Sequence, residues 1–181
     1  MIPEARRLLD DSLVFFRGRG ISGGPPSALK MGPPPQDSRP GAGRYNQDGQ
    51  SVLYLCDSEE GVRRELHAWR VTGVPYVQRF RLPVSELSIA DFTDVPPEHF
   101  VAAVFSKAEE CKVDGRGPDS YVFSEVVAEL VSAHFDGMRI PGVRGARPVL
   151  YGNVVLFRPS PDWPKWLEPG SSPYPLEVPV P

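Results

Sequence analysis

The sequence is poor in the features that mark metal sites, disulfide scaffolds and membrane spans. Its two cysteines, Cys56 and Cys111, and its three histidines show no metal-ligand spacing, and a chain of 181 residues needs no disulfide to hold a core. No apolar run reaches the length of a transmembrane helix, and the N-terminal MIPEARRLLDD lacks the apolar segment of a signal peptide. We therefore expect a cytoplasmic protein with no metal cofactor.

An excess of positive charge is also missing. The formal net charge is −3, which argues against direct nucleic-acid binding because such proteins usually carry a basic excess. Hydrophobic residues make up 40% of the chain, enough for one buried core. The 22 prolines and 17 glycines predict long loops around that core.

Strands and helices are expected in a mixed order. Apolar and alternating runs predict strands at 13–18, 51–57, 76–82, 136–143 and 149–157. Helical patterns are found at 3–11, 58–71, 98–105 and 120–135. Because the order lacks regular βαβ alternation, it favours the α+β class. The expected organisation is an N-terminal extension (1–12), a domain (13–158) and a proline-rich tail (159–181) that wraps the surface or is disordered.

Two of the predicted helices and one predicted loop have further signals in the sequence. Ser58 is an expected N-cap, and Val62, Leu66 and Trp69 fall on one face, so Glu65 lies on a helix that follows a strand directly. The helix over 120–135 is expected to bury an apolar stripe formed by Val122, Val126, Leu130, Phe123, Val127 and Val131. The glycine- and proline-rich segment Gly20–Gly43 predicts a loop that is mobile or forms the wall of a cleft.

The familiar nucleotide and hydrolase motifs are absent. No GxGxxG follows a strand, and neither GxxxxGK[ST] nor GxSxG occurs. The most informative stretch is instead GRYNQDGQSVLYLCDSEEGVRREL, Gly43 to Leu66. It places Arg-Tyr-Asn at the mouth of a loop, a tyrosine in the middle of the next strand and a glutamate about two turns into the next helix.

This arrangement resembles the RES-domain family. The matching pieces are Arg17 in FFRG, the element GRYN, the strand VLYL, the helix glutamate Glu65, and DGMRIPGV followed by GNVVLF. The resemblance spans about residues 13–158. It implies an ADP-ribosyltransferase-like fold, with a split mixed or antiparallel sheet and flanking helices. It also implies that the protein uses NAD as a substrate and cleaves the nicotinamide–ribose bond.

The resemblance also implies a set of site residues. The expected catalytic residues are Glu65, Arg17 and Tyr54, and the expected NAD-binding residues are Arg44, Tyr45, Asn46 and Asn153. The chemistry of these side chains agrees with that assignment. A guanidinium can bind two phosphate oxygens at once, and a carboxylate stabilises positive charge that develops on the ribose. We predict that Arg17, Arg44, Tyr54 and Glu65 line one cleft. RES domains typically act as toxins paired with an antitoxin, so a cognate antitoxin is the expected protein partner.

One position departs from the family pattern. Where RES domains carry a serine, this chain has Gly142, and Ser120 or Ser124 would have to supply the hydroxyl. One reading is therefore an active glycohydrolase, phosphorylase or ADP-ribosyltransferase, whose acceptor is water, phosphate or a protein. The other is a non-catalytic module that binds a nucleotide or a protein.

Overall fold

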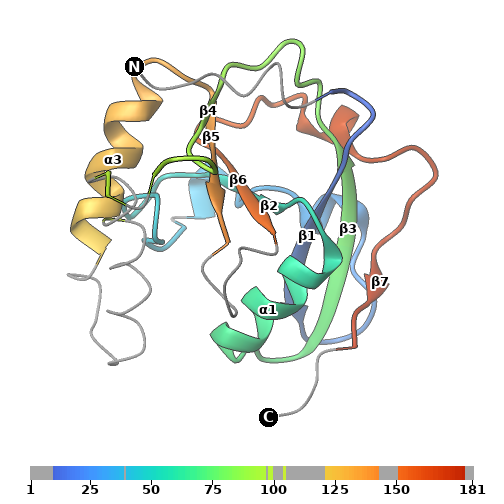
Figure 1. The fold of residues 1–181 in the computed structure, drawn as a ribbon. Helices are drawn as coiled ribbons and strands as arrows, with labels where there is room; N and C mark the ends of the chain where they lie inside the picture. Colours follow the sequence, from blue (N-terminus) through green and yellow to red (C-terminus); the bar gives the residue numbers. More distant parts are fainter. Residues whose placement is uncertain are drawn as a thin grey trace.

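One mixed sheet organises the molecule (Figure 1). The structure, a computed structural model, describes residues 10–38, 40–96, 98–99, 104, 121–142 and 151–177. Seven strands pair in the order β4-β5-β6-β2-β1-β3-β7. The pair β4–β5 is parallel, and the others are antiparallel. This confirms the α+β class.

The elements follow the predicted order with some additions. The strands are β1 (Val14–Ile21), β2 (Leu53–Cys56), β3 (Val74–Arg81), β4 (Ile89–Asp91), β5 (Gly137–Pro141), β6 (Gly152–Leu156) and β7 (Tyr174–Pro175). The α-helices are α1 (Glu59–Trp69) and α3 (Val122–Ser132), and short 3-10 turns lie at Ala28–Met31, Gln36–Ser38 and Trp163–Trp166. The predicted helix over 3–11 and most of the one over 98–105 lie outside the described residues. None of the described helices is long and apolar enough to cross a membrane.

The first strand is longer than the sequence predicted. A strand ending at Gly18 was expected, but β1 continues to Ile21. A Cβ on Gly18 would lie 2.3 Å from Val62 Cγ1, and one on Gly20 would lie 2.3 Å from the carbonyl oxygen of Thr72. Both glycines therefore allow neighbouring elements to approach the strand closely, and they do not end it.

The sheet is split between β1 and β2. The pairing of β1 with β3 runs from Val14↔Arg81 to Ile21↔Val74. The pairing of β1 with β2 rests on the single pair Phe16↔Cys56. The two halves of the sheet thus meet at one point and separate beyond it, as the resemblance implied.

Both α-helices cover the same face of the sheet. Val62 and Leu66 of α1 pack in one cluster with Cys56, and α3 packs in another with Val155. The opposite face carries a third cluster, formed by Phe15, Leu53, Leu55, Phe80, Leu82, Val84, Ile89, Val154, Leu156 and Trp166. Because side chains alternate along a strand, Asn153 leaves β6 on the same face as Val155. This face, between α1 and α3, is where most of the predicted site residues gather; Arg17 leaves β1 on the opposite side.

The buried face of α3 differs from the prediction. The helix buries Ser124, Val127, Ala128 and Val131. The other predicted members of the stripe are exposed, namely Val122, Phe123, Val126 and Leu130. An α-helix that is apolar on most of its circumference does not reveal from sequence which side meets the core.

The segments after β3 are more regular than expected. No strand was predicted between residues 83 and 97, yet β4 lies there. The tail packs on the sheet through Trp166, which is 8% exposed, and through Trp163, whose ring centroid lies 6.2 Å from that of Phe80. It then adds β7 to the edge of the sheet. The tryptophans act as packing anchors, and the tail is part of the fold.

Candidate functional site

Glu65 lies in the middle of α1 and faces β6. The helix begins directly after β2 because the Ser58 hydroxyl caps it, accepting a hydrogen bond from Gly61 N at 3.1 Å. Glu65 Oε1 accepts two hydrogen bonds, from the Tyr151 hydroxyl at 3.0 Å and from Asn153 Nδ2 at 3.1 Å. Glu65 Oε2 has no hydrogen-bond partner among the described residues. The carboxylate is therefore fixed at one oxygen and available at the other.

The side chain of Asn153 is itself oriented by a hydrogen bond from Cys56. Its Oδ1 accepts a hydrogen bond from the Cys56 thiol at 2.9 Å. Since a carboxylate only accepts, the amide must turn Nδ2 toward Glu65 and Oδ1 toward Cys56. Burial, reinforced by the negative charges of Glu65 and Asp57, raises the pKa of the Cys56 thiol well above its ordinary value. The neutral thiol is the form that can donate.

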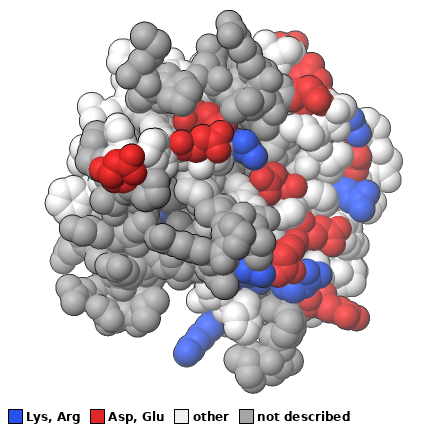
Figure 2. Space-filling view, in the orientation of Figure 1, with Lys and Arg blue, Asp and Glu red and all other residues white. Residues whose placement is uncertain are grey.

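The neighbouring arginines on α1 pair elsewhere. Arg63 Nη1 and Arg64 Nε lie 2.7 and 2.8 Å from the two oxygens of Glu60. Figure 2 shows acidic and basic side chains next to each other on the face that carries α1. Glu65 instead accepts partly buried hydrogen bonds from Tyr151 and Asn153.

Tyr54 anchors the loop that carries Arg44. Its hydroxyl donates to Asn46 Oδ1 at 2.8 Å and accepts from Tyr45 N at 3.1 Å. Burial raises the pKa of Tyr54, so the phenol stays protonated and able to donate. Asn46 Nδ2 in turn donates to Gly41 O at 3.1 Å and Gln47 O at 3.0 Å. The structure thus brings Tyr54, Tyr45 and Asn46 together as one hydrogen-bonded unit of the loop.

Arg44 is buried on the helix-covered face with part of its guanidinium unsatisfied. It is 6% exposed, and its Nε and Nη2 have no hydrogen-bond partner within the described part of the chain. Burial alone would lower the pKa of Arg44, but Tyr45 and the carboxylate of Glu65 more than offset this and raise it. The Ser124 hydroxyl on α3 donates to Arg44 O at 2.6 Å. Ser124 therefore holds the loop of Arg44, and Ser120 lies outside the described residues.

Arg17 lies at the point where the sheet opens. It follows Phe16, the residue that forms the single pair between β1 and β2. Phe16 and Gly18 face α1, so the alternation of the strand directs Arg17 to the other side. Arg17 is 9% exposed, and its Nε and Nη1 have no partner among the residues described. Burial, with the charge of Arg19 adding, lowers the pKa of Arg17 to about 9, while Tyr54 acts in the opposite direction.

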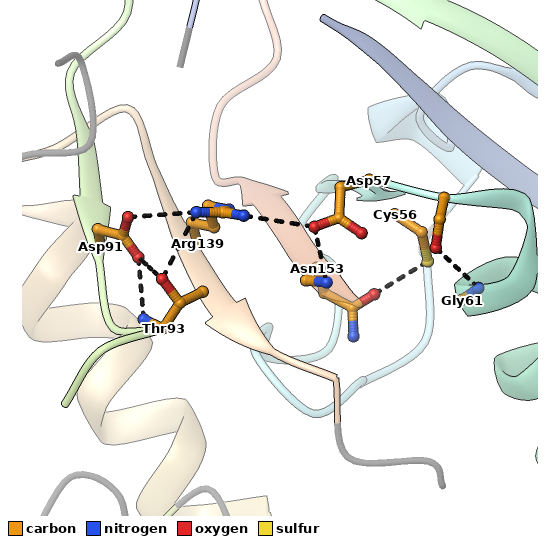
Figure 3. Close-up of polar contacts among 9 residues, drawn as sticks. Cys56, Asp57, Gly61, Asp91, Thr93, Arg139 and Asn153 are labelled. Carbon is orange, nitrogen blue, oxygen red and sulfur yellow. Dashed lines mark hydrogen bonds and ion pairs between the residues drawn. The ribbon is translucent and has the colours of Figure 1, made fainter. Parts of the chain in front are cut away.

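A polar network on the opposite face of the sheet fixes β6, the strand whose Asn153 is hydrogen-bonded to Glu65 (Figure 3). Gly152 lies between Tyr151 and Asn153, and its N–H donates to Asp57 Oδ2 at 2.8 Å. The N–H of Asp57 donates to Gly152 O at 3.0 Å. Arg139 lies between two carboxylates, with Nη2 3.4 Å from Asp57 Oδ2 and Nη1 3.5 Å from Asp91 Oδ2. This network ties β4, β5 and β6 to the segment that enters α1.

The structure brings most of the predicted residues together in two adjoining units. Glu65 and Asn153 form one unit, and Arg44, Tyr45, Asn46 and Tyr54 form the other. The charge of Glu65 acts on Arg44 across them. Among the described residues, Arg17 is connected to this set through its electrostatic interaction with Tyr54. That Arg17, Arg44, Tyr54 and Glu65 line one cleft therefore stays a prediction. In the described segments, no group of three or more His, Cys, Asp or Glu side chains could hold a metal ion.

Sequence reasoning missed Tyr151 and Cys56. Tyr151 stands two residues before Asn153, and residues two apart along a strand share a face. Cys56 stands at the end of the strand that precedes α1, opposite Asn153 in the pairing of β2 with β6. Once Asn153 is a candidate, the spacing of Tyr151 is the available signal, but the contact with Cys56 depends on a strand register that the sequence does not fix.

A family model and a solved structure both match this chain. The model of the RES domain family matches residues 24–177. Among solved structures, the chain is similar to a chain of the M. tuberculosis MbcT–MbcA toxin–antitoxin complex, with a TM-score of 0.50 and 15% sequence identity, and the likeness covers 90% of this chain and 83% of that chain. No curated protein matches the sequence. At this identity the structural likeness concerns the fold alone.

Proposed function

This chain belongs to the RES domain family, and on that premise we propose that it binds NAD and cleaves the nicotinamide–ribose bond. One observation carries the proposal. A glutamate fixed at one oxygen and available at the other lies within electrostatic reach of a buried, partly unsatisfied arginine. A buried cation without full hydrogen bonding is costly, and a bound phosphate oxygen would satisfy it.

Arg44 and Glu65 have different tasks in this proposal. The pyrophosphate of NAD is anionic both before and during the reaction, so Arg44 binds ground state and transition state alike. Arg17 also has buried, unpaired N–H groups, and it lies where the sheet opens, on the side of β1 away from α1. In this proposal it would contact the phosphates through that opening. Positive charge develops on the ribose only as nicotinamide departs. Glu65 Oε2 faces that charge while Oε1 remains held by Tyr151 and Asn153, so the carboxylate acts mainly in the transition state.

The acceptor of the ribosyl group is identified by the products. The purified protein is incubated with NAD in buffer with and without inorganic phosphate, and the products are analysed by mass spectrometry. Water as acceptor gives free ADP-ribose in both buffers, whereas phosphate as acceptor gives a phosphorylated product only when phosphate is present. A protein acceptor leaves the mass of ADP-ribose on a polypeptide. Unchanged NAD under all conditions would refute the cleavage proposal.

We also propose that the protein is the toxin of a toxin–antitoxin pair with a cognate antitoxin as its partner. The family match and the fold shared with a chain of a toxin–antitoxin complex support this. Induced expression of the chain alone should arrest growth and lower the cellular NAD content. Growth and NAD content that match an uninduced culture would contradict the toxin proposal.

A second candidate is a non-catalytic module that binds a nucleotide or a protein. The observation in its favour is Gly142, which stands where the family resemblance leads us to expect a serine. Calorimetry on the purified chain separates the two functions, because the module binds NAD, or a protein, without consuming NAD. The active enzyme gives products in the mass-spectrometric assay.

A further inference from the structure

Tyr151 is buried directly against the carboxylate of Glu65. Its side chain is 5% exposed, and its hydroxyl lies 3.0 Å from Glu65 Oε1. We propose that Tyr151 is a positioning residue, whose phenolic O–H holds Glu65 in the orientation that the reaction requires. The inference rests on the proposed function for the reaction, but the hydrogen bond that carries it can be tested without NAD.

Two glycines form a seat for the ring of Tyr151. A Cβ on Gly61, one turn before Glu65 on α1, would lie 2.6 Å from Tyr151 Cδ2. A Cβ on Gly142, just after β5, would lie 2.4 Å from both Cε2 and Cζ. Neither glycine has a positive φ, so the backbone does not require glycine there. Both positions lack a side chain because the Tyr151 ring fills the space that a side chain would need.

The seat fixes the hydroxyl as well as the ring. The ring lies between α1 and the end of β5, and Gly142 N donates to Tyr151 O at 2.8 Å. A glutamate side chain has several rotatable bonds, and a single hydrogen bond would leave its carboxylate free to rotate. Two donors on one oxygen, Tyr151 and Asn153, restrict that rotation and leave Oε2 directed away from them. A preorganised charge is the form in which a carboxylate contributes most to a transition state.

The same geometry accounts for the departure from the family pattern. At Gly142, where the resemblance leads us to expect a serine, the space that a side chain would need is filled by the Tyr151 ring. The hydroxyl group at this point of the site therefore comes from Tyr151, which reaches Glu65 across the glycine. A phenylalanine would fill the seat equally well, so packing alone does not explain a tyrosine.

The test removes the hydroxyl and keeps the ring. Tyr151→Phe should lower kcat by roughly 10- to 100-fold, the effect of losing a hydrogen bond to a charged group, while KM stays within about twofold because NAD does not bind through this group. The matched control is Tyr174→Phe, since the Tyr174 hydroxyl is bonded to Glu59 on the same helix but away from Glu65. The control should keep the kcat of the wild type.

A second measurement is independent of turnover. With ¹³C-labelled glutamate, the side-chain carboxyl resonance of Glu65 is assigned by its absence in Glu65→Gln. It should shift in Tyr151→Phe and stay in place in Tyr174→Phe. A shift in a protein that does not consume NAD would support the positioning contact and overturn the proposed reaction. An unchanged resonance together with unchanged kcat in a folded Tyr151→Phe protein would overturn the inference.

Discussion

Replacing Glu65 by glutamine removes the charge and keeps the contacts. The amide oxygen can accept from the Tyr151 hydroxyl and Asn153 Nδ2 as Oε1 does now, and the amide nitrogen takes the place of Oε2. The fold and the position of the side chain should therefore be retained. What changes is the interaction between Oε2 and the positive charge that develops on the ribose.

The size of the effect follows from that single charge. A unit charge at about 4 Å from another in a medium of effective dielectric constant near 20 is worth about 4 kcal/mol. Loss of one preorganised electrostatic group typically lowers kcat by about 10² to 10³, or roughly 3 to 4 kcal/mol. The two estimates agree, so we expect kcat of Glu65→Gln to fall by about 10² to 10³. Affinity for NAD should change little, because the charge on the ribose is absent in the ground state.

The assay compares two glutamates on the same helix. Glu60 forms ion pairs with Arg63 and Arg64 on the outer side of α1, so Glu60→Gln removes the same charge away from the site and should leave kcat within about twofold, since exposed ion pairs contribute little. Binding of NAD is measured by calorimetry and turnover by release of nicotinamide. Near-normal kcat in a folded Glu65→Gln protein would refute the assignment of Glu65.

Three further predictions test the surroundings of the site. Arg44→Ala should raise KM by about 10-fold or more with a smaller change in kcat, because a charge-assisted hydrogen bond to phosphate is lost in both states; a fall in kcat alone would argue against the clamp. Gly142→Ser should abolish turnover by displacing the Tyr151 ring, which lies 2.4 Å from the new Cβ, and an activity equal to or above wild type would contradict that seat. Gly18→Ala should lower the free energy of unfolding by about 1 to 3 kcal/mol through overpacking against α1, measured by urea denaturation. Gly41→Ala, with open space around it, serves as its control, and equal stabilities of the two variants would refute the close packing.

Local sequence signals were sufficient for the elements that carry the site. The run SVLYLCD followed by Ser58 and two acids predicted a strand and a capped helix, and β2 and α1 occur there with the expected cap. The arrangement of Arg44, Tyr45 and Asn46 on a loop was also accessible, because glycines and prolines surround it. These features depend on contacts within a few residues of sequence, where propensity and capping decide the outcome.

The orientation of elements relative to one another was not accessible in the same way. The predicted stripe of six apolar residues covers more of α3 than its buried face, and the structure buries two of the six, Val127 and Val131. The buried face also includes Ser124, whose hydroxyl reaches Arg44 O. A polar residue at a buried position has no apolar signal, so the apolar pattern did not include Ser124. Similarly, Gly18 was interpreted as the end of a strand because the approach of α1 to β1 is a contact across more than forty residues.

The glycines around Glu65 illustrate why the site is harder to predict than the fold. Gly61 and Gly142 look in sequence like a helix interior and a turn, and neither needs glycine for its backbone. Their lack of side chains becomes informative only when Tyr151 is placed between them, and the position of Tyr151 depends on the register of β6, which Asp57 fixes through both hydrogen-bonding groups of Gly152. A motif comparison that treats Gly142 as a missing serine therefore registers the loss of one hydroxyl at this point of the chain. It misses the tyrosine that brings another hydroxyl to the same carboxylate from nine residues further along.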